Sequence, residues 1–108
     1  LFEASVSGGF PKASSWRCRF PEPVAVDRLC VSPDKRRVAL SGVVRRTAGG
    51  LLLGPANRGA KFQTLAVAED LYLIGWLDPE TLIYRENFQA IKALNIRTGR
   101  EAFLWRPS

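Results

Sequence analysis

The sequence predicts an all-β protein built from antiparallel units of four strands each. Short runs of leucine, β-branched and aromatic residues alternate with Gly, Pro, Asn and Asp, which is the pattern of strands joined by tight turns. No segment keeps the apolar period of about 3.6 residues that marks a long amphipathic helix. The 108 residues, of which 46% are hydrophobic and 24% charged, are sufficient for a folded core.

The turn residues divide the chain into ten expected strands. These are Leu1–Val6, Trp16–Phe20, Val24–Val31, Arg37–Val44, Leu51–Gly54, Lys61–Ala68, Leu71–Leu77, Thr81–Tyr84, Ala90–Ile96 and Glu101–Trp105. Residues 86–94 also fit a helix, but the hairpin-turn composition of Arg97–Arg100 favours a strand before it. The glycines at 8–9, 49–50 and 54–59 lack a strand–loop–helix context, so we interpret them as loops.

Two segments repeat the same order of strand, turn and strand. Ser32-Pro33-Asp34 forms the turn of the first segment, and Asp78-Pro79-Glu80 takes the same place in the second. The two prolines are 46 residues apart, which is close to the period of about 40 to 50 residues found in some repeat proteins. Proline presets φ in a turn, and a polar side chain before it can accept a backbone N–H. Each segment therefore predicts a hairpin, which a second pair of strands follows.

These motifs resemble the WD40-like and TolB-like β-propeller repeats. Val31–Leu40 is similar to the family's turn between its first two strands, Ile74–Tyr84 to the variant with Trp before that turn, and Asn95–Arg100 to the next hairpin turn. The resemblance implies a partial β-propeller in which residues 1–22 form the last two strands of one blade and residues 23–68 and 69–108 form two blade-like units. Since propellers have four or more blades, a small β-sandwich or barrel is the alternative.

An incomplete ring leaves sheet faces open, so we expect a chain that belongs to a larger polypeptide or packs against further copies. Methionine is absent even at position 1, which predicts a trimmed, processed or excised segment. The apolar runs are far shorter than the roughly 20 residues of a membrane-spanning helix. The expected partners are therefore a protein or further segments of the same propeller, with no membrane span and no compartment assigned.

The chain contains no histidine, which excludes Ser-His-Asp catalysis, Cys-His catalysis and imidazole ligation of metals within it. Cys18 and Cys30 are the only cysteines. A hairpin at Pro21–Pro23 would place them opposite one another and permit a disulfide, whereas separate strands predict two thiols. We expect a non-catalytic protein-interaction or scaffold module without a cofactor or metal. The alternative is a propeller segment that gates or positions the catalytic domain of a larger enzyme.

Sixteen Lys and Arg residues against ten Asp and Glu give a formal net charge of +6, which raises the prospect of an acidic partner. The candidate partner-binding residues are Trp16, Arg17, Arg19, Arg36, Arg45 and Arg46. Arg36 and Arg45 flank one predicted strand and should emerge at its opposite ends. A binder of nucleic acid or anionic surfaces is a second alternative, which the even spread of charge disfavours. Trp16, Trp76 and Trp105 are expected to pack in the core or between blades.

Overall fold

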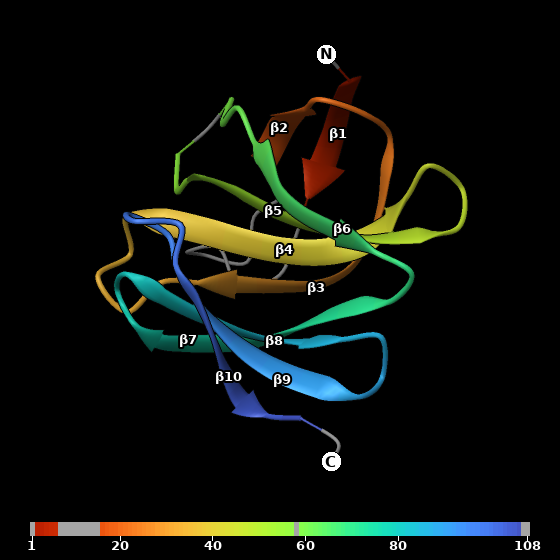
Figure 1. Cartoon of the computed structure of the whole chain (residues 1–108). Coiled ribbons are helices and arrows are strands. Elements are labelled where there is room, and N and C mark those ends of the chain that lie inside the picture. The colour runs from red at the N-terminus through yellow and green to blue at the C-terminus, as the bar shows by residue number, and fades with distance from the viewer. Residues whose placement is uncertain (1, 7–15, 58, 107–108) are drawn as a thin grey trace.

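The computed structural model is all-β and contains, in its described part, three antiparallel sheets stacked on one another (Figure 1). It describes residues 2–6, 16–57 and 59–106, with side chains from Cys18 onward. An N-terminal pair contains β1 (Phe2–Val6) and β2 (Trp16–Phe20). The middle sheet contains β3 (Val24–Val31), β4 (Arg37–Val44), β5 (Ala48–Pro55) and β6 (Gln63–Ala68). The C-terminal sheet contains β7 (Leu71–Asp78), β8 (Thr81–Glu86), β9 (Ala90–Asn95) and β10 (Glu101–Trp105).

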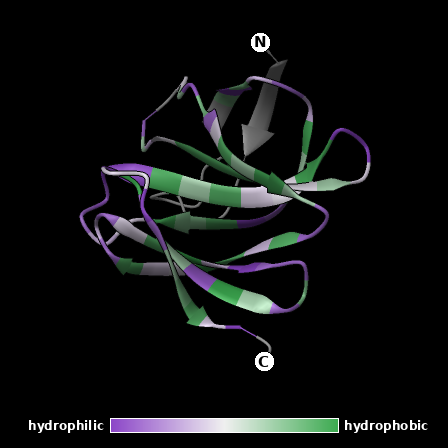
Figure 2. Ribbon diagram, viewed as in Figure 1, coloured by the Kyte–Doolittle hydropathy of each residue, from purple (hydrophilic) through white to green (hydrophobic). Residues whose placement is uncertain are grey.

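Each four-stranded sheet is a simple meander in which consecutive strands are neighbours. The prediction of antiparallel four-stranded units is therefore confirmed, and β2, β3, β4 and β10 have the predicted bounds. Within residues 86–94, Glu86 ends β8, residues 87–89 form a turn and residues 90–94 belong to β9, which rules out the helical interpretation of that segment. Hydrophobic residues gather along the strands and hydrophilic residues at the turns, as the alternation of the sequence indicates (Figure 2).

The interpretation of Gly49 and Gly50 as a loop is wrong, because β5 begins at Ala48 and both glycines lie inside this strand. The physical reason is the close approach of the next sheet. A Cβ on Gly49 would lie 2.3 Å from the backbone nitrogen of Leu71, the first residue of β7. Glycine is needed here so that two backbones can pass at short distance, which is a known use of glycine within strands.

Successive side chains of a strand point to opposite sides, so the middle sheet has apolar residues on both faces. Another sheet covers each face. One face packs against the N-terminal pair in a first core, formed by Cys18, Phe20, Val38, Leu40, Val44, Leu52, Ala60 and Phe62. The other face packs against the C-terminal sheet in a second core, formed by Ala39, Leu51, Leu53, Leu71, Leu73, Leu82, Tyr84 and Leu94. The middle sheet thus separates two cores that share no residue.

A buried serine joins the middle sheet to the C-terminal sheet. The Ser41 hydroxyl donates a hydrogen bond to Asp27 Oδ1 at 2.7 Å and accepts one from the backbone N–H of Leu73 at 3.0 Å. Asp27 is available for this contact because the β3–β4 ladder is irregular between Val26 and Arg28. The arrangement satisfies a buried polar group while linking three strands, and it helps to fix how the two sheets are placed.

The two cysteines lie on opposite sides of the middle sheet. Cys18 belongs to the first core, whereas Cys30 packs against the second. No disulfide joins them, so the prediction of separate strands is confirmed and the compact hairpin at Pro21–Pro23 is not formed. Burial raises the pKa of the Cys18 thiol, which favours its protonated form.

The tryptophans behave differently from one another. Trp76 is half-buried against the second core, and its indole N–H donates a hydrogen bond to the carbonyl oxygen of Cys30 at 3.0 Å. This agrees with the expected packing between sheets. Trp105 is 58% exposed, so the same expectation is wrong for it within this chain. Its strand pairs it with Ile91 on the side of the C-terminal sheet that faces away from the second core. The side chain of Trp16 lies outside the described residues.

Candidate functional site

The turn after β3 presents two arginines at one end of the middle sheet. Pro33 and Asp34 form this turn, as predicted, and Ser32 stabilises it by accepting the backbone N–H of Arg37 at 3.1 Å. Asp34 Oδ1 accepts the Ser32 hydroxyl at 2.6 Å and the backbone N–H of Arg36 at 3.1 Å. Both hydrogen bonds stabilise the charged carboxylate and so lower the pKa of Asp34, and the bond from Ser32 has the larger effect. The turn therefore holds Arg36 and Arg37 where β4 begins.

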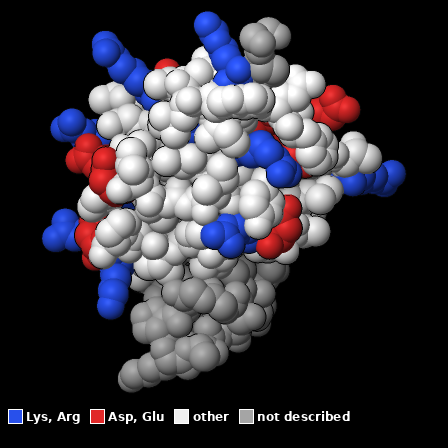
Figure 3. Space-filling model, turned by 90° about the horizontal axis from the view of Figure 1, so that it is seen from below, with Lys and Arg blue, Asp and Glu red and all other residues white. Residues whose placement is uncertain are grey.

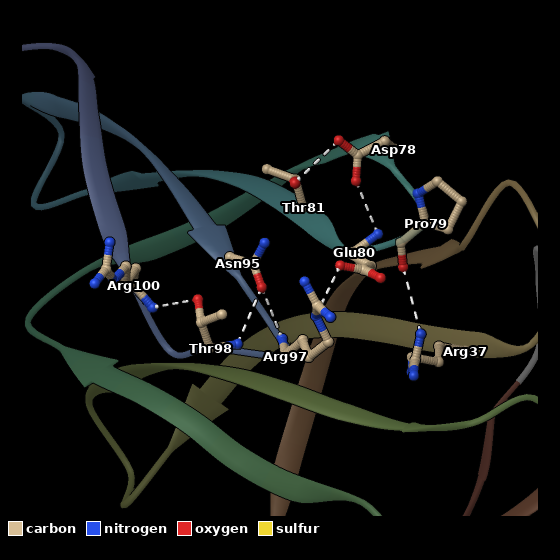
Figure 4. Close-up of polar contacts among 9 residues, drawn as sticks. All are labelled: Arg37, Asp78, Pro79, Glu80, Thr81, Asn95, Arg97, Thr98 and Arg100. Carbon is tan, nitrogen blue, oxygen red and sulfur yellow. Dashed lines mark hydrogen bonds and ion pairs between the residues drawn. The ribbon is translucent and has the colours of Figure 1, made fainter.

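The corresponding turn of the C-terminal sheet lies beside the first. Asp78 Oδ1 accepts the backbone N–H of Glu80 at 2.8 Å, which is the bond predicted for the residue before proline. The guanidinium of Arg37 reaches across from the middle sheet and donates to the carbonyl oxygen of Pro79 at 3.5 Å (Figure 4). This contact fixes the direction of Arg37 and leaves its other N–H donors available.

The β9–β10 turn lies at the same end of the molecule, and its Arg97 is paired with an acid. Asn95 Oδ1 accepts the backbone N–H groups of Arg97 and Thr98, both at 3.0 Å. Arg97 forms an ion pair with Glu80 at 3.2 Å (Figure 4). The positive charge of Arg97 is thus balanced within the C-terminal sheet.

A pocket of about 410 Å³ opens where β4 begins and β5 ends. Its walls are contributed by Arg36, Arg37, Leu53, Gly54, Pro55, Lys61 and Gln63. The strand register explains this grouping, since Arg37 pairs with Pro55 and Leu53 pairs with Gln63 across neighbouring strands. Three cationic side chains and one amide therefore surround a short apolar surface, which suits a ligand that carries both an anionic group and an aliphatic part.

The turn before β4 places the acid Asp34 near Arg36 and Arg37, with which it interacts electrostatically. Within the part of the chain that the structure describes, Arg36, Arg37 and Lys61 form no ion pair. Arg36 and Lys61 are exposed to solvent. The Asp34 carboxylate accepts hydrogen bonds within the turn, and its charge offsets part of the positive charge of Arg36 and Arg37. We name Arg36, Arg37 and Lys61, with the surface between them, the basic pocket.

Arg19 lies next to the basic pocket through a parallel bridge. Its backbone N–H donates to the carbonyl oxygen of Ala60 at 2.7 Å, and its carbonyl oxygen accepts the N–H of Phe62 at 2.8 Å. The bridge pairs Arg19 with Lys61, which places both side chains on the side away from the first core. The sequence does not mark Lys61 as part of a basic cluster, because its direct neighbours Ala60 and Phe62 are apolar.

The remaining candidates are placed elsewhere or lie outside the described residues. Arg45 and Arg46 occupy the β4–β5 turn at the opposite end of β4 from Arg36, as predicted. Arg45 forms an ion pair with Glu22 at 3.1 Å. Trp16 and Arg17 belong to β2, but their side chains are not among the described ones. The structure therefore brings Arg19 and Arg36 to one region and separates them from Arg45 and Arg46.

A second polar cluster lies on the inner side of the C-terminal sheet. The buried Tyr84 hydroxyl donates to Glu101 Oε1 at 2.9 Å, and Lys92 contacts Glu86 at 3.1 Å and Glu101 at 3.5 Å. Burial, followed by the hydrogen bond to Glu101, raises the pKa of Tyr84. Burial alone would lower the pKa of Lys92, but Glu86 and Glu101 outweigh it and raise that pKa. The polar groups of this cluster bind one another, so it is not a candidate ligand site.

The raised pKa of Tyr84 predicts a loss of stability at alkaline pH. An unfolded tyrosine ionises near pH 10, whereas Tyr84 stays neutral in the folded chain, so its stabilising effect is complete below about pH 10 and declines as the pH rises further. In a Tyr72→Phe variant, which leaves Tyr84 as the single tyrosine, phenolate absorbance should increase only as the chain unfolds. Phenolate absorbance that increases near pH 10, while circular dichroism still shows a folded chain, would contradict this prediction.

Comparison with protein-family models, with curated proteins and with solved structures finds no match to this chain. Among the described residues, no helix is long and apolar enough to cross a membrane. In the same part of the chain, no three His, Cys, Asp or Glu side chains gather as a candidate metal site.

Proposed function

We propose that the chain is a non-catalytic protein-interaction or scaffold module of β-propeller type, which works as part of a larger chain or assembly. In this proposal, residues 1–22, 23–68 and 69–108 are three successive units of one stack of sheets. The observation that supports it most directly is the outer face of the C-terminal sheet. On this face, apolar residues take three of the places that apolar residues hold on the face of the middle sheet that the C-terminal sheet covers, whereas Arg85 takes the place of Ser41.

The strand registers give the correspondence. Counted from the first residue of each strand, Ile83 in β8 takes the place of Ala39 in β4. Across the neighbouring ladder, Ala39 pairs with Leu53, and Ile83 pairs with Ala93. Two residues further along the ladder, Ser41 pairs with Leu51, and Arg85 pairs with Ile91. The outer residues Ile83, Ala93 and Ile91 are thus equivalent to Ala39, Leu53 and Leu51.

The two equivalent faces differ in what covers them. Ala39, Leu51 and Leu53 are at most 7% exposed, because Leu71 and Leu73 of the next sheet pack on them. The outer face of the C-terminal sheet leaves Tyr72, Ile74 and Trp105 between 36% and 58% exposed. Figure 3, which looks toward this side of the molecule, shows uncharged surface over much of it, with charged side chains at its edges and some within it. Apolar surface of this kind is typical of a contact with another protein or sheet.

Sedimentation over a wide dilution range tests the proposal. We expect a mass above 12.0 kDa at high concentration that falls to 12.0 kDa on dilution, because exposed apolar faces associate. Ile91→Asp should shift the association to higher concentration, whereas the matched control Val67→Asp, on an exposed residue of β6, should not. A cooperative monomer of 12.0 kDa at every concentration would contradict the proposal and favour a self-contained sandwich or barrel.

A further inference from the structure

We infer that the basic pocket binds the side-chain carboxylate of an acidic, extended peptide segment from a partner protein. The inference rests on the proposed interaction role and adds the chemistry of the partner and the place where it binds. Neither the alternation of the sequence nor the repeat of the sheets requires this pocket, since its cations come from the turn before β4, from the first residue of β4 and from the segment before β6.

The donors of the pocket match a carboxylate. An arginine carries several N–H donors in a planar fork that suits two carboxylate oxygens, and lysine adds a compact positive charge. Arg37 is already oriented by its bond to Pro79, so little freedom is lost when it receives a ligand. Arg36 and Lys61 approach from the neighbouring segments, and Gln63 contributes an amide at the same wall.

The apolar part of the pocket favours a peptide over a free inorganic anion. Leu53, Gly54 and Pro55 form a surface between the cations, against which the methylene groups of a glutamate or a neighbouring aliphatic side chain can pack. The pocket also lies beside Gln63, where the edge strand β6 begins. In the described part of the chain β6 is paired only with β5, while β2 bridges residues 60–62 just before it. The outer edge of β6 beyond this bridge can receive an extended segment.

The distribution of cations disfavours a nucleic acid as the ligand. A nucleic acid is held by a track of several cations that follows its phosphates. Here the basic pocket and its neighbour Arg19 form one concentrated site, while Arg45 and Arg46 lie at the opposite end of β4. A single strong anion site beside a strand edge is better suited to one carboxylate on an extended chain.

Fluorescence anisotropy with a labelled peptide of alternating glutamate and valine provides the test. We expect saturable binding that weakens about tenfold in Arg36→Gln and about tenfold in Lys61→Gln, since each removes a charged hydrogen-bond donor. Arg106→Gln is the matched control, because it removes the same charge after β10, away from the pocket. Equal melting temperatures would show that the variants fold alike, as expected for exposed residues.

Three results would overturn the inference. The first is a peptide with glutamine in place of glutamate that binds equally well, and the second is an Arg106→Gln variant that weakens binding as much as Arg36→Gln. The third is a single-stranded oligonucleotide that competes more strongly than the unlabelled peptide, which would assign the site to phosphate. Sedimentation does not depend on the pocket. If the unsubstituted chain associated as expected but did not bind the peptide, this inference alone would be overturned and the proposed function would stand.

Discussion

Leu51→Ala is expected to lower the free energy of unfolding by about 2 to 5 kcal/mol, because it removes a fully buried side chain from a strand whose sheet is covered on both faces. The surrounding residues come from two different sheets and can collapse only partly into the space. Urea unfolding of the two proteins, followed by circular dichroism and by tryptophan fluorescence, measures the difference.

Ile91→Ala is the matched control for this substitution. Ile91 holds the equivalent position in β9, but it faces the open side of the C-terminal sheet. At a concentration where the chain is monomeric, we expect a cost of about 1 kcal/mol, since less apolar surface is buried there. Equal costs for the two substitutions would show that the correspondence between the sheets, or the exposure of the outer face, is wrong.

Gly49→Ala should destabilise the chain by about 3 kcal/mol, which is at the upper end of what a single added methyl group costs in a packed interior. The new Cβ would lie 2.3 Å from the backbone nitrogen of Leu71, and a backbone atom cannot turn away as a flexible side chain can. The connection into β7 would have to move, and with it the contact between the middle and C-terminal sheets. Thermal unfolding and near-ultraviolet circular dichroism report this loss.

Gly75→Ala provides the comparison, because a Cβ at Gly75 meets no atom within 4 Å. Gly75 lies within β7, and alanine there restricts the unfolded chain more than the folded one. The expected change is within about 1 kcal/mol of zero and on the stabilising side. If Gly49→Ala were as mild as Gly75→Ala, the close approach of the two sheets would be refuted.

The hairpins of this protein were predictable because their determinants are local. Ser32 and Asp78 each accept a backbone N–H across a turn that contains proline, and both bonds span only a few residues. The bounds of β3 and β4 follow from such turns and from the alternation of side chains between them. The placement of Arg36 and Arg45 at opposite ends of β4 follows from the same local geometry.

Other features depend on which segments meet in space. A Gly-Gly pair such as Gly49-Gly50 is typical of a loop, and the approach of Leu71 explains why Gly49 lies within a strand. Lys61 lies far from Arg36 and Arg37 along the chain, yet the fold places all three in the basic pocket. Trp105 is a large apolar residue of the kind expected in a core, but its side of the C-terminal sheet is uncovered within this chain.

The all-β class, the order of the hairpins and the lack of histidine chemistry follow from the amino-acid sequence, since alternation, turn composition and residue types are properties of short segments. The positions of Cys18 and Cys30 on opposite sides of the middle sheet, and the meeting of Arg36, Arg37 and Lys61 in one pocket, depend on the packing of the sheets. These arrangements arise when whole sheets pack to bury their apolar faces, and the energy of that packing depends on residues far apart in the chain.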